Sequence, residues 1–461
     1  MNRIFDFFDI ETVTVDTKNI NLSNSKLNPS FYSSNQAFIN GLKTKPLDEL
    51  CEDIFNPPVF KREFIDDATE CRYFASAEIS SLEPEINFIT NEQADRLNLR
   101  VRKNWILITG FGTIGNIRIV DKIIENYAVA NNVARIVPKQ NLIGFIAAFL
   151  SSNYGKKLLN DFAAGAVVKY IEAPQISQIP IPILSEEIIE KTNEFYLKTV
   201  RCREEAHTLL DKAKSLVLTY NHLPPLEEAE LETLDPDKET DLRLVSSAEF
   251  TDDFRLDAHF YNPMAALAVR NIREKTSNFQ ELFKSAESIF MRNRFSRNYV
   301  EKEQGLPFLS GKNIIQIRPE QKYISLTETN EIDELRVKKG WILITRSGTL
   351  GRVGFVWNNY EDYTATEDII RVSPNENIDP GYLYSFLSSE YGYHQIIKYK
   401  HGAVIDHITP EQIADIVIPI PNENEIKEIG DLVRQAYDLR AEAIRLEDEA
   451  QEILTKALTG K

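Results

Sequence analysis

Three groups of residues in this chain have types and spacings that could carry chemistry. Residues 110–115 read Gly-Phe-Gly-Thr-Ile-Gly, the G-x-G-x-x-G spacing of loops that approach a nucleotide phosphate. Residues 56–59 read Asn-Pro-Pro-Val, which differs from an Asn-Pro-Pro-aromatic motif only at position 59. In that motif the aromatic ring stacks on a base. The third group, a set of side chains that can bind a transition metal, consists of His394, His401, Asp406 and His407.

An internal repeat decides how these groups are interpreted. The segment Trp-Ile-Leu-Ile-Thr occurs at 105–109 and again at 341–345, an offset of 236 residues. Trp105 at its start corresponds to Trp341, and in the turn that follows Gly112, Thr113 and Gly115 correspond to Gly348, Thr349 and Gly351. Three further motifs recur in the same order: F-L-S-S-x-Y-G at 149–155 and 386–392, G-A-V at 165–167 and 402–404, and I-P-I-P at 179–182 and 418–421. We therefore expect a duplication whose matched residues form a shared scaffold.

The repeat argues against all three groups as catalytic or metal sites. The second copy has Arg346 where the first has Gly110, so the glycine pattern is expected to be a turn. Position 59 is Val and the second copy has no Asn-Pro-Pro, which disfavours an S-adenosylmethionine-dependent methyltransferase within this chain. In the first copy Ala164, Lys169 and Tyr170 stand opposite the last three members of the histidine group, so we expect no bound metal.

Each copy ends in a predicted long helix, about 185–222 and 422–458, which begins after the prolines of the I-P-I-P motif. Both helices carry a stripe at 3,4 spacing over roughly five heptads, which predicts that they pair with each other as an antiparallel coiled coil. The expected pairing residues are Tyr196, Ala206, Leu210, Ala213 and Val217 in the first helix, and Leu432, Leu439, Leu446 and Ile453 in the second. The alternative is that each helix packs only on its own domain.

These elements predict an α+β protein with two duplicated mixed α/β domains, separated by two long antiparallel helices and related by a pseudo-twofold. We expect the first domain at 1–184, its helix at 185–222, a connector at 223–253, the second domain at 254–421 and its helix at 422–461. The connector holds eleven acidic and two basic residues and three prolines, which is typical of a solvated linker.

The composition is that of a globular protein, with 43% hydrophobic residues, and excludes wholesale disorder. Three cysteines without C-x-x-C spacing indicate a reducing compartment. The start has no secretory pattern, and the longest apolar run, 142–150, is too short to span a bilayer, so we expect a cytoplasmic protein without membrane contact.

The net charge of −17 argues at first against nucleic acid, but the charge is unevenly distributed. The connector alone contributes −9, which leaves −8 for the rest of the chain. Cations gather near the repeated turn in both copies, with aromatic residues among them, a pattern that suits phosphate contact and reading of base edges. The candidate DNA-binding residues are Lys61, Arg62, Arg102, Lys103 and Arg118 in the first copy, and Arg292, Arg294, Arg297, Lys312, Arg346, Ser347 and Arg352 in the second.

The ordered set of repeated motifs, each copy followed by a long helix, resembles the specificity subunit of type I restriction–modification systems. The resemblance covers nearly the whole chain. It implies two target-recognition domains that each read one half of a bipartite double-stranded DNA site, with the paired helices fixing the spacer. It also implies docking of two methyltransferase subunits that carry S-adenosylmethionine, and of ATP-driven restriction subunits, while this chain is non-catalytic and binds no cofactor.

If the two domains read different half-sites, the residues that differ between the copies should include those that read bases. Arg292, Arg294, Arg297 and Arg346 are not reproduced one for one in the first copy, so we expect base contacts from them, since arginine at guanine is the commonest specific pairing. Two alternatives stay open: a standalone adenine methyltransferase, and an acidic protein-interaction scaffold that does not read DNA.

Overall fold

The computed structural model describes residues 42–165, 167–226, 255, 257–320, 322–358, 360–402 and 406–460. The chain divides into two compact units: unit 1 comprises Met1–Arg201 with Arg445–Lys461, and unit 2 comprises Cys202–Ile444. Each unit therefore contains one mixed domain and a part of each long helix. The predicted acidic connector lies, apart from its first four residues, outside the described residues.

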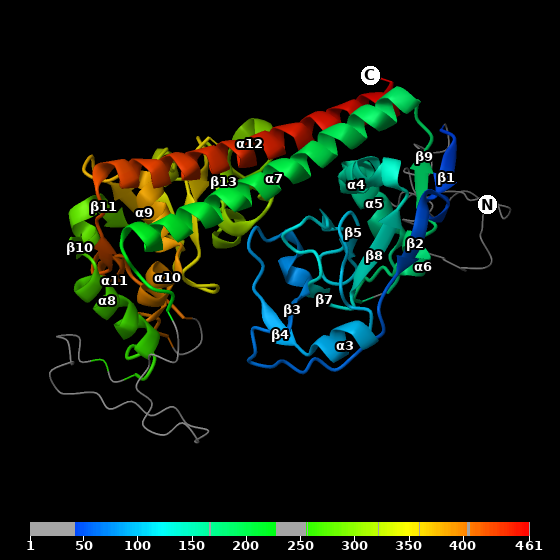
Figure 1. Cartoon of the computed structure of the whole chain (residues 1–461). Coiled ribbons are helices and arrows are strands. Elements are labelled where there is room, and N and C mark those ends of the chain that lie inside the picture. The colour runs from blue at the N-terminus through cyan, green and yellow to red at the C-terminus, as the bar shows by residue number, and fades with distance from the viewer. Residues whose placement is uncertain are drawn as a thin grey trace. The chain divides into compact units, whose positions relative to one another are not determined.

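Unit 1 is built on a four-stranded antiparallel sheet with the strand order β2-β8-β5-β6. Figure 1 labels the first three of these strands. Its strands are β2 (Cys51–Phe55), β8 (Val133–Pro138), β5 (Ile106–Thr109) and β6 (Ile117–Ile119). A three-stranded sheet and a two-stranded ladder complete it: β4 (Asn87–Ile89), β3 (Cys71–Phe74) and β7 (Ala128–Val129), and β1 (Thr44–Pro46) with β9 (Pro180–Pro182). The α-helices of this domain are α3 (Asn91–Arg96), α4 (Ile143–Ser151), α5 (Asn153–Phe162) and α6 (Ala173–Ile176).

Unit 2 repeats this topology strand for strand in its main sheet, with the order β11-β18-β15-β16. These strands are β11 (Ala286–Phe290), β18 (Ile369–Pro374), β15 (Ile342–Thr345) and β16 (Val353–Phe355). The other strands are β12 (Tyr299–Val300), β14 (Tyr323–Ser325), β13 (Gly305–Leu309) and β17 (Thr364–Ala365), with the ladder β10 (Phe279–Glu281) and β19 (Val417–Pro419). The α-helices are α8 (Pro263–Lys275), α9 (Pro380–Leu387), α10 (Glu390–Ile397) and α11 (Pro410–Ala414).

The register of the two main sheets is also the same. Leu107 pairs with Arg135 in unit 1, and Leu343 pairs with Arg371 at the equivalent position of unit 2. The expected fold class, a duplicated α+β protein whose mixed domains are each followed by a long helix, is confirmed.

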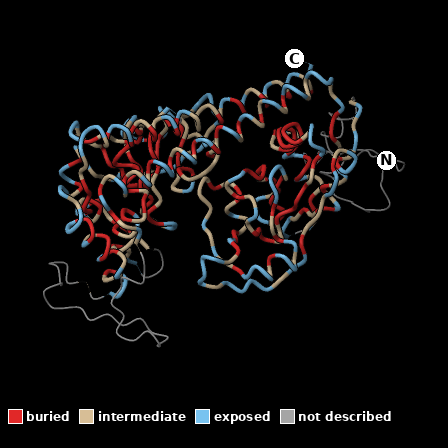
Figure 2. The backbone as a smooth tube through the Cα atoms, in the orientation of Figure 1, coloured by how far each residue is buried: buried red, intermediate tan, exposed pale blue. Residues whose placement is uncertain are grey.

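The repeated strand, β5 in unit 1 and β15 in unit 2, is buried on both faces of its sheet. This burial explains its continuous apolar sequence. In unit 1, Ile106 and Ile108 face a cluster that contains Phe145 and Phe149 of α4, and Leu107 faces a second cluster around Phe74. Figure 2 shows these buried segments in red within the domain. The strand therefore cannot shift, and the turn that follows it is held in place.

The two long helices are α7 (Glu186–Tyr220) and α12 (Glu423–Thr459), within two residues of the predicted ends. In unit 1, Tyr196 near the start of α7 shares a buried cluster with Leu454 and Leu458 near the end of α12. In unit 2, the hydroxyl of Tyr220 at the end of α7 donates to Glu428 near the start of α12 at 2.6 Å. The helices therefore pair within each unit and run antiparallel, as predicted.

Most residues of the predicted pairing stripe are buried, except at its C-terminal end. The buried members are Tyr196, Ala206, Leu210, Ala213, Val217, Leu432 and Leu446, and Leu439 packs partly buried against the same core. At that end Ile453 is only half-buried, and the neighbouring Leu454 is fully buried. A straight helix turns about 20° per heptad away from a strict seven-residue repeat, which moves the buried line onto the next residue.

Candidate nucleic-acid interface

The same turn follows strand β5 in unit 1 and strand β15 in unit 2. In unit 1 the Thr109 hydroxyl donates to the Thr113 carbonyl at 2.5 Å and accepts from the Asn116 N–H at 3.0 Å. The hydroxyl of Thr345 makes the corresponding two bonds in unit 2, also at 2.5 and 3.0 Å. The threonine that ends the repeated strand therefore closes the turn.

The glycines of this turn are required by the backbone and not by a nucleotide. Gly112 and Gly348 have φ values of +73° and +71°, in the left-handed region that favours glycine. A Cβ atom at either position would have no heavy atom within 4 Å, so crowding does not select glycine there. The G-x-G-x-x-G spacing at 110–115 is thus explained by a turn.

Both repeated tryptophans anchor the start of the repeated strand, at the end opposite the turn, to the outer strand of the sheet, which is β2 in unit 1 and β11 in unit 2. Trp105 packs edge-on against Phe55 with 5.6 Å between ring centroids, and Trp341 packs edge-on against Phe290 at 5.5 Å. The two copies therefore hold this part of the sheet by the same contact.

A buried arginine in each main sheet was not singled out by the sequence analysis. Arg135 and Arg371 are fully buried, and burial lowers the pKa of each guanidinium, to about 9 and to about 10 respectively. Arg135 donates to the carbonyls of Leu99, Val129, Ala130 and Val133. Arg371 donates to the carbonyls of Ala365 and Ile369. Each arginine fixes the loop that leads into β8 or β18, and the offset of 236 residues could have revealed the pair.

A second segment bridges the turn in both units, but the side chains there differ. The Ile171 N–H donates to the Gly110 carbonyl at 2.9 Å, and the Ile408 N–H donates to the Arg346 carbonyl at 3.2 Å. A Cβ atom on Gly110 would lie 2.3 Å from the Ile171 carbonyl oxygen, so unit 1 has no room for a side chain at that position. The backbone is shared, and the arginine belongs to unit 2 alone.

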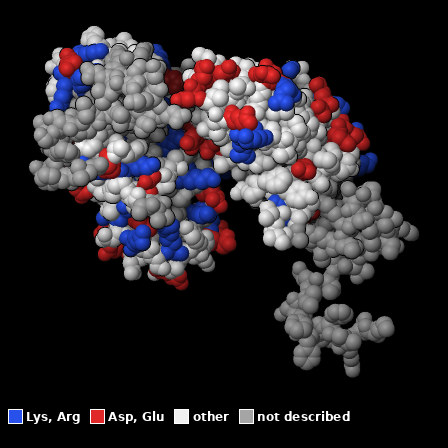
Figure 3. Space-filling model, turned by 90° about the horizontal axis from the view of Figure 1, so that it is seen from below, with Lys and Arg blue, Asp and Glu red and all other residues white. Residues whose placement is uncertain are grey.

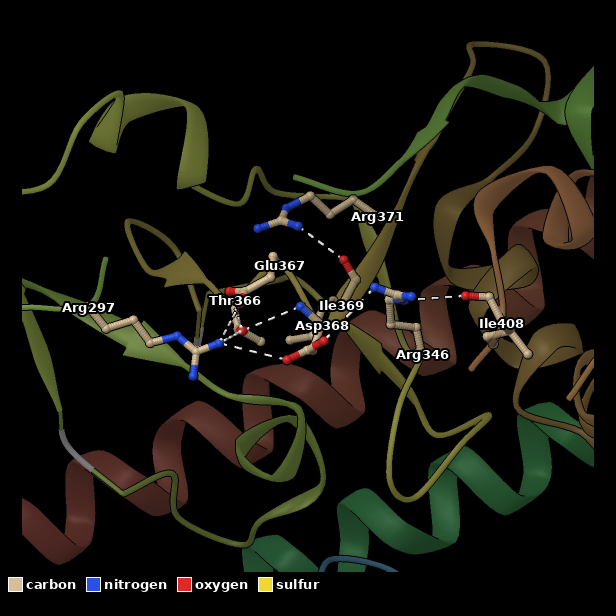
Figure 4. Close-up of polar contacts among 8 residues, drawn as sticks. All are labelled: Arg297, Arg346, Thr366, Glu367, Asp368, Ile369, Arg371 and Ile408. Carbon is tan, nitrogen blue, oxygen red and sulfur yellow. Dashed lines mark hydrogen bonds and ion pairs between the residues drawn. The ribbon is translucent and has the colours of Figure 1, made fainter. Parts of the chain in front are cut away.

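In unit 2 the loop before β18 supplies two carboxylates to the candidate arginines (Figure 4). The Nη2 of Arg297 donates to Glu367 Oε1 and to Thr366 Oγ1, both at 2.8 Å, and lies 3.7 Å from an Asp368 carboxylate oxygen. The Nη1 of Arg346 lies 4.0 Å from the other Asp368 oxygen, and its Nε donates to the Ile408 carbonyl at 3.3 Å. One acidic pair thus links two of the predicted DNA-binding residues.

The charges of this group are mutually stabilised. Burial raises the pKa of the Glu367 carboxyl, but the hydrogen bond from Arg297 and the bonds from its own backbone and Thr366 outweigh burial, so the pKa lies below its ordinary value. For Arg297 burial lowers the pKa, and the bond to Glu367 and the nearby acids raise it above its ordinary value. The pair is therefore ionised at neutral pH.

The remaining candidates of unit 2 differ in their exposure and contacts. Arg292 is paired with Glu334 at 2.6 Å and sits over the Phe290 ring, 5.0 Å from its centroid. Arg294 and Lys312 are exposed, and Arg352 and Ser347 are half-buried. On the face drawn in Figure 3, lysine and arginine side chains gather on the part of the surface that unit 2 forms, at the left of the view, with acidic side chains among them.

The candidates of unit 1 divide into exposed and buried ones. Lys61, Arg62, Arg102 and Lys103 are exposed, and the Arg102 guanidinium lies 6.0 Å from the Trp105 ring centroid. Arg118 is only 6% exposed, donates to the Ser81 carbonyl at 2.9 Å and pairs with Asp121 at 3.3 Å. The Arg118 guanidinium therefore lies inside the domain, where it is not exposed to DNA.

The Asn-Pro-Pro segment and the histidine group, which the sequence offered as possible chemical sites, make contacts that hold the fold together. Asn56 donates to the Asn131 carbonyl at 3.1 Å and accepts from the Ala173 N–H at 2.8 Å, so it ties β2 to α6. His401 and His407 form a pair of backbone hydrogen bonds with each other. Within the described part of the chain no three His, Cys, Asp or Glu side chains converge as metal ligands. No described helix is long and apolar enough to cross a membrane.

The sequence matches one protein family over both copies. Residues 40–195 and 275–450 match the model of the type I restriction modification DNA specificity domain. Because these ranges cover most of the chain, the chain belongs to this family. Its function is that of the DNA specificity subunit of a type I restriction–modification system.

Solved structures of the same kind align over nearly the full length. The type I restriction-modification S subunit from M. genitalium aligns with 14% identity and a TM-score of 0.32, covering 90% of this chain and 94% of that one. The HsdS subunit from Thermoanaerobacter tengcongensis aligns with 16% identity and a TM-score of 0.28, covering 91% and 97%. A search among curated proteins found no significant match.

Proposed function

We propose that each unit of this specificity subunit reads one half of a bipartite double-stranded DNA site. The observation that carries the proposal is the shared turn and its bridge, which have the same backbone in both units and different side chains. A backbone that is identical twice is suited to hold position, and side chains that differ are suited to recognise different bases.

Cations that occur in both units are the proposed phosphate contacts. Arg102 lies over Trp105, and Lys338 lies over Trp341 at the equivalent position, 5.6 Å from the ring centroid. Contacts common to both half-sites cannot carry sequence information, whereas they fix the register of each unit on the duplex.

Cations that occur only in unit 2 are the proposed base contacts. Arg294 and Arg346 belong to this set. Arg297 has Arg62 as its counterpart in unit 1, but we place it with them because unit 1 has Asn131 and Asn132 where unit 2 has the carboxylates of Glu367 and Asp368. The N–H donors of each arginine can be satisfied by O6 and N7 of guanine in the major groove. Lys312, Ser347 and Arg352 are assigned to the same surface of unit 2, and Lys61 and Arg62 to the corresponding surface of unit 1.

The chain itself is proposed to be non-catalytic and to act within a complex. Its partners are two methyltransferase subunits that carry S-adenosylmethionine, together with ATP-driven restriction subunits in the complete assembly. The net charge of −17 supports this proposal, because an acidic chain gains much of its phosphate grip from partner subunits.

The test is hydroxyl-radical footprinting with the methyltransferase subunits present, compared with the chain alone. The proposal predicts two short protected segments with an unprotected spacer, only in DNA that contains the bipartite site. Protection that ignores sequence would contradict it and favour the acidic scaffold. Isothermal titration of S-adenosylmethionine into the purified chain tests the other alternative, a standalone methyltransferase, and we expect no binding.

A further inference from the structure

We propose that Glu367 and Asp368 are specificity-determining positioning residues, which hold Arg297 and Arg346 for a guanine-containing half-site and repel phosphate from the same surface. This inference rests on the proposed function and assigns a base class to unit 2. It concerns the two acids, which lie beside the predicted reading residues and carry the wrong charge for DNA.

The acids are not needed to build the domain. Unit 1 forms the same main sheet, turn and bridge with Asn131 and Asn132 at the positions of Glu367 and Asp368. Its Gly110 takes the place of Arg346. Since the fold is reached without any of these charges, their presence in unit 2 is explained by what unit 2 must recognise.

The buried carboxylate of Glu367 would destabilise the fold if it lost its partners Arg297 and Thr366. Its side chain is only 9% exposed, and a buried carboxylate is stable only when it is paired and hydrogen-bonded. Arg297 and Thr366 supply those bonds, each within 3.0 Å. The arginine is thereby fixed in one orientation, which removes much of the entropy loss that a mobile side chain suffers on binding a base.

The geometry leaves donors for DNA. The three contacts of Arg297 with the loop all involve Nη2, and Figure 4 shows another terminal nitrogen pointing away from the carboxylates. Arg346 engages Nε and Nη1, so within the described residues its Nη2 has no partner. Each arginine therefore keeps N–H donors for acceptor atoms on a base edge.

The electrostatic consequence separates this role from that of a simple brace. A carboxylate pair beside the arginines repels the phosphates of non-specific DNA, which carry a full negative charge, more strongly than guanine O6 and N7, which carry only partial charges. Removing the negative charge should strengthen binding to any DNA and weaken discrimination at one half-site. A brace that only supports the fold would weaken both.

The variants are Glu367→Gln with Asp368→Asn, and Asp368→Asn alone. The amides keep the size of the side chains, and Asp368 is more exposed than Glu367, so the single variant is the milder one. Glu274→Gln on α8, which is exposed, removes one charge from the same unit and serves as the control. Thermal unfolding of each purified protein is measured first. We expect Asp368→Asn and the control to unfold as the wild type does, and the double variant, which loses the buried Glu367–Arg297 ion pair, to unfold at a lower temperature. Binding is therefore measured well below the unfolding temperature of every variant.

The measurement is equilibrium binding of the complex with methyltransferase subunits to DNA with the intact site and with either half-site altered, over a range of salt. For the double variant we expect discrimination at the unit 2 half-site to fall by about tenfold, within the range for one arginine–guanine pair. We also expect tighter non-specific binding, with the slope of log K against log salt steeper by about one. Discrimination at the other half-site and in Glu274→Gln should not change.

Two results would overturn the inference. One is a double variant with the wild-type discrimination and salt slope, and the other is equal loss of affinity on specific and non-specific DNA. If the wild-type complex itself shows no discrimination at either half-site, the proposed function fails, which is a different outcome.

Discussion

Replacement of the buried arginines tests whether they hold the loops that carry the differing side chains. We predict that Arg371→Met destabilises unit 2 and leaves unit 1 unaffected, and that Arg135→Met does the reverse with a larger effect. The ordering follows from the number of carbonyl groups that each guanidinium satisfies, four for Arg135 and two for Arg371.

The magnitude can be worked from these bonds. Leaving a buried acceptor unpaired costs about 1–3 kcal/mol. The low end applies because some of these carbonyls keep a second donor, as the Leu99 carbonyl does from the Val129 N–H at 3.1 Å. At about 1 kcal/mol for each lost bond, Arg371→Met costs about 2 kcal/mol and Arg135→Met about 4 kcal/mol. Methionine removes the buried charge, so both figures are upper values.

Hydrogen exchange measured by mass spectrometry assigns each loss to its unit. For Arg371→Met we expect faster exchange in β15 and β18 and unchanged exchange in β5 and β8, which serve as the control within the same molecule. Urea denaturation gives the total free energy of unfolding. Wild-type stability in both variants, or equal loss of protection in both units from one substitution, would refute the reasoning.

Three further outcomes follow from the long helices. Leu446→Ala should lower the free energy of unfolding, measured by thermal unfolding, by about 3 kcal/mol, because Leu446 is fully buried. Ile453→Ala should lower it by less than half as much, because Ile453 is only half-buried. Equal losses would contradict a shift of the buried line from Ile453 to Leu454. Gly144→Ala should lower the melting temperature, because a Cβ would lie 2.4 Å from the Asn193 carbonyl oxygen of α7, and an unchanged temperature would show that α4 and α7 can separate without loss. Deletion of seven residues from each long helix shortens each by about 10 Å and should shorten the DNA spacer by about three base pairs, with both half-sites kept. An assembled complex with an unchanged spacer would show that the helices do not set it.

The fold was largely predictable because the chain is duplicated. The repeat aligns Trp105 with Trp341 and identifies the same strand and turn in each copy. A misassignment in one copy can therefore be corrected from the other. The long helices were predictable from their 3,4 stripe and the prolines that precede them. The shift from Ile453 to Leu454 was not, because it depends on the accumulated rotation of the helix.

The candidate site was predictable only in part. The cations near the repeated turn could be found in the sequence from their charge, but the sequence does not show which of them are buried. Arg118 is an internal residue that donates to the Ser81 carbonyl and pairs with Asp121. The acids Glu367 and Asp368 carried no signal, since their role depends on Arg297, which is about 70 residues away in sequence and meets them only through the fold.

The central claim, that the two units read different half-sites, is tested most directly by methylome sequencing of cells that carry the chain with its methyltransferase partners. The comparison is between the wild type and Arg294→Ala with Arg346→Ala, with Lys275→Ala on the exposed end of α8 as the matched control. We predict that the double variant loses or relaxes base requirements in one half of the bipartite motif, with the other half and the spacer unchanged, and that the control matches the wild type. Unchanged modification at the full motif, or equal relaxation of both halves, would contradict the account.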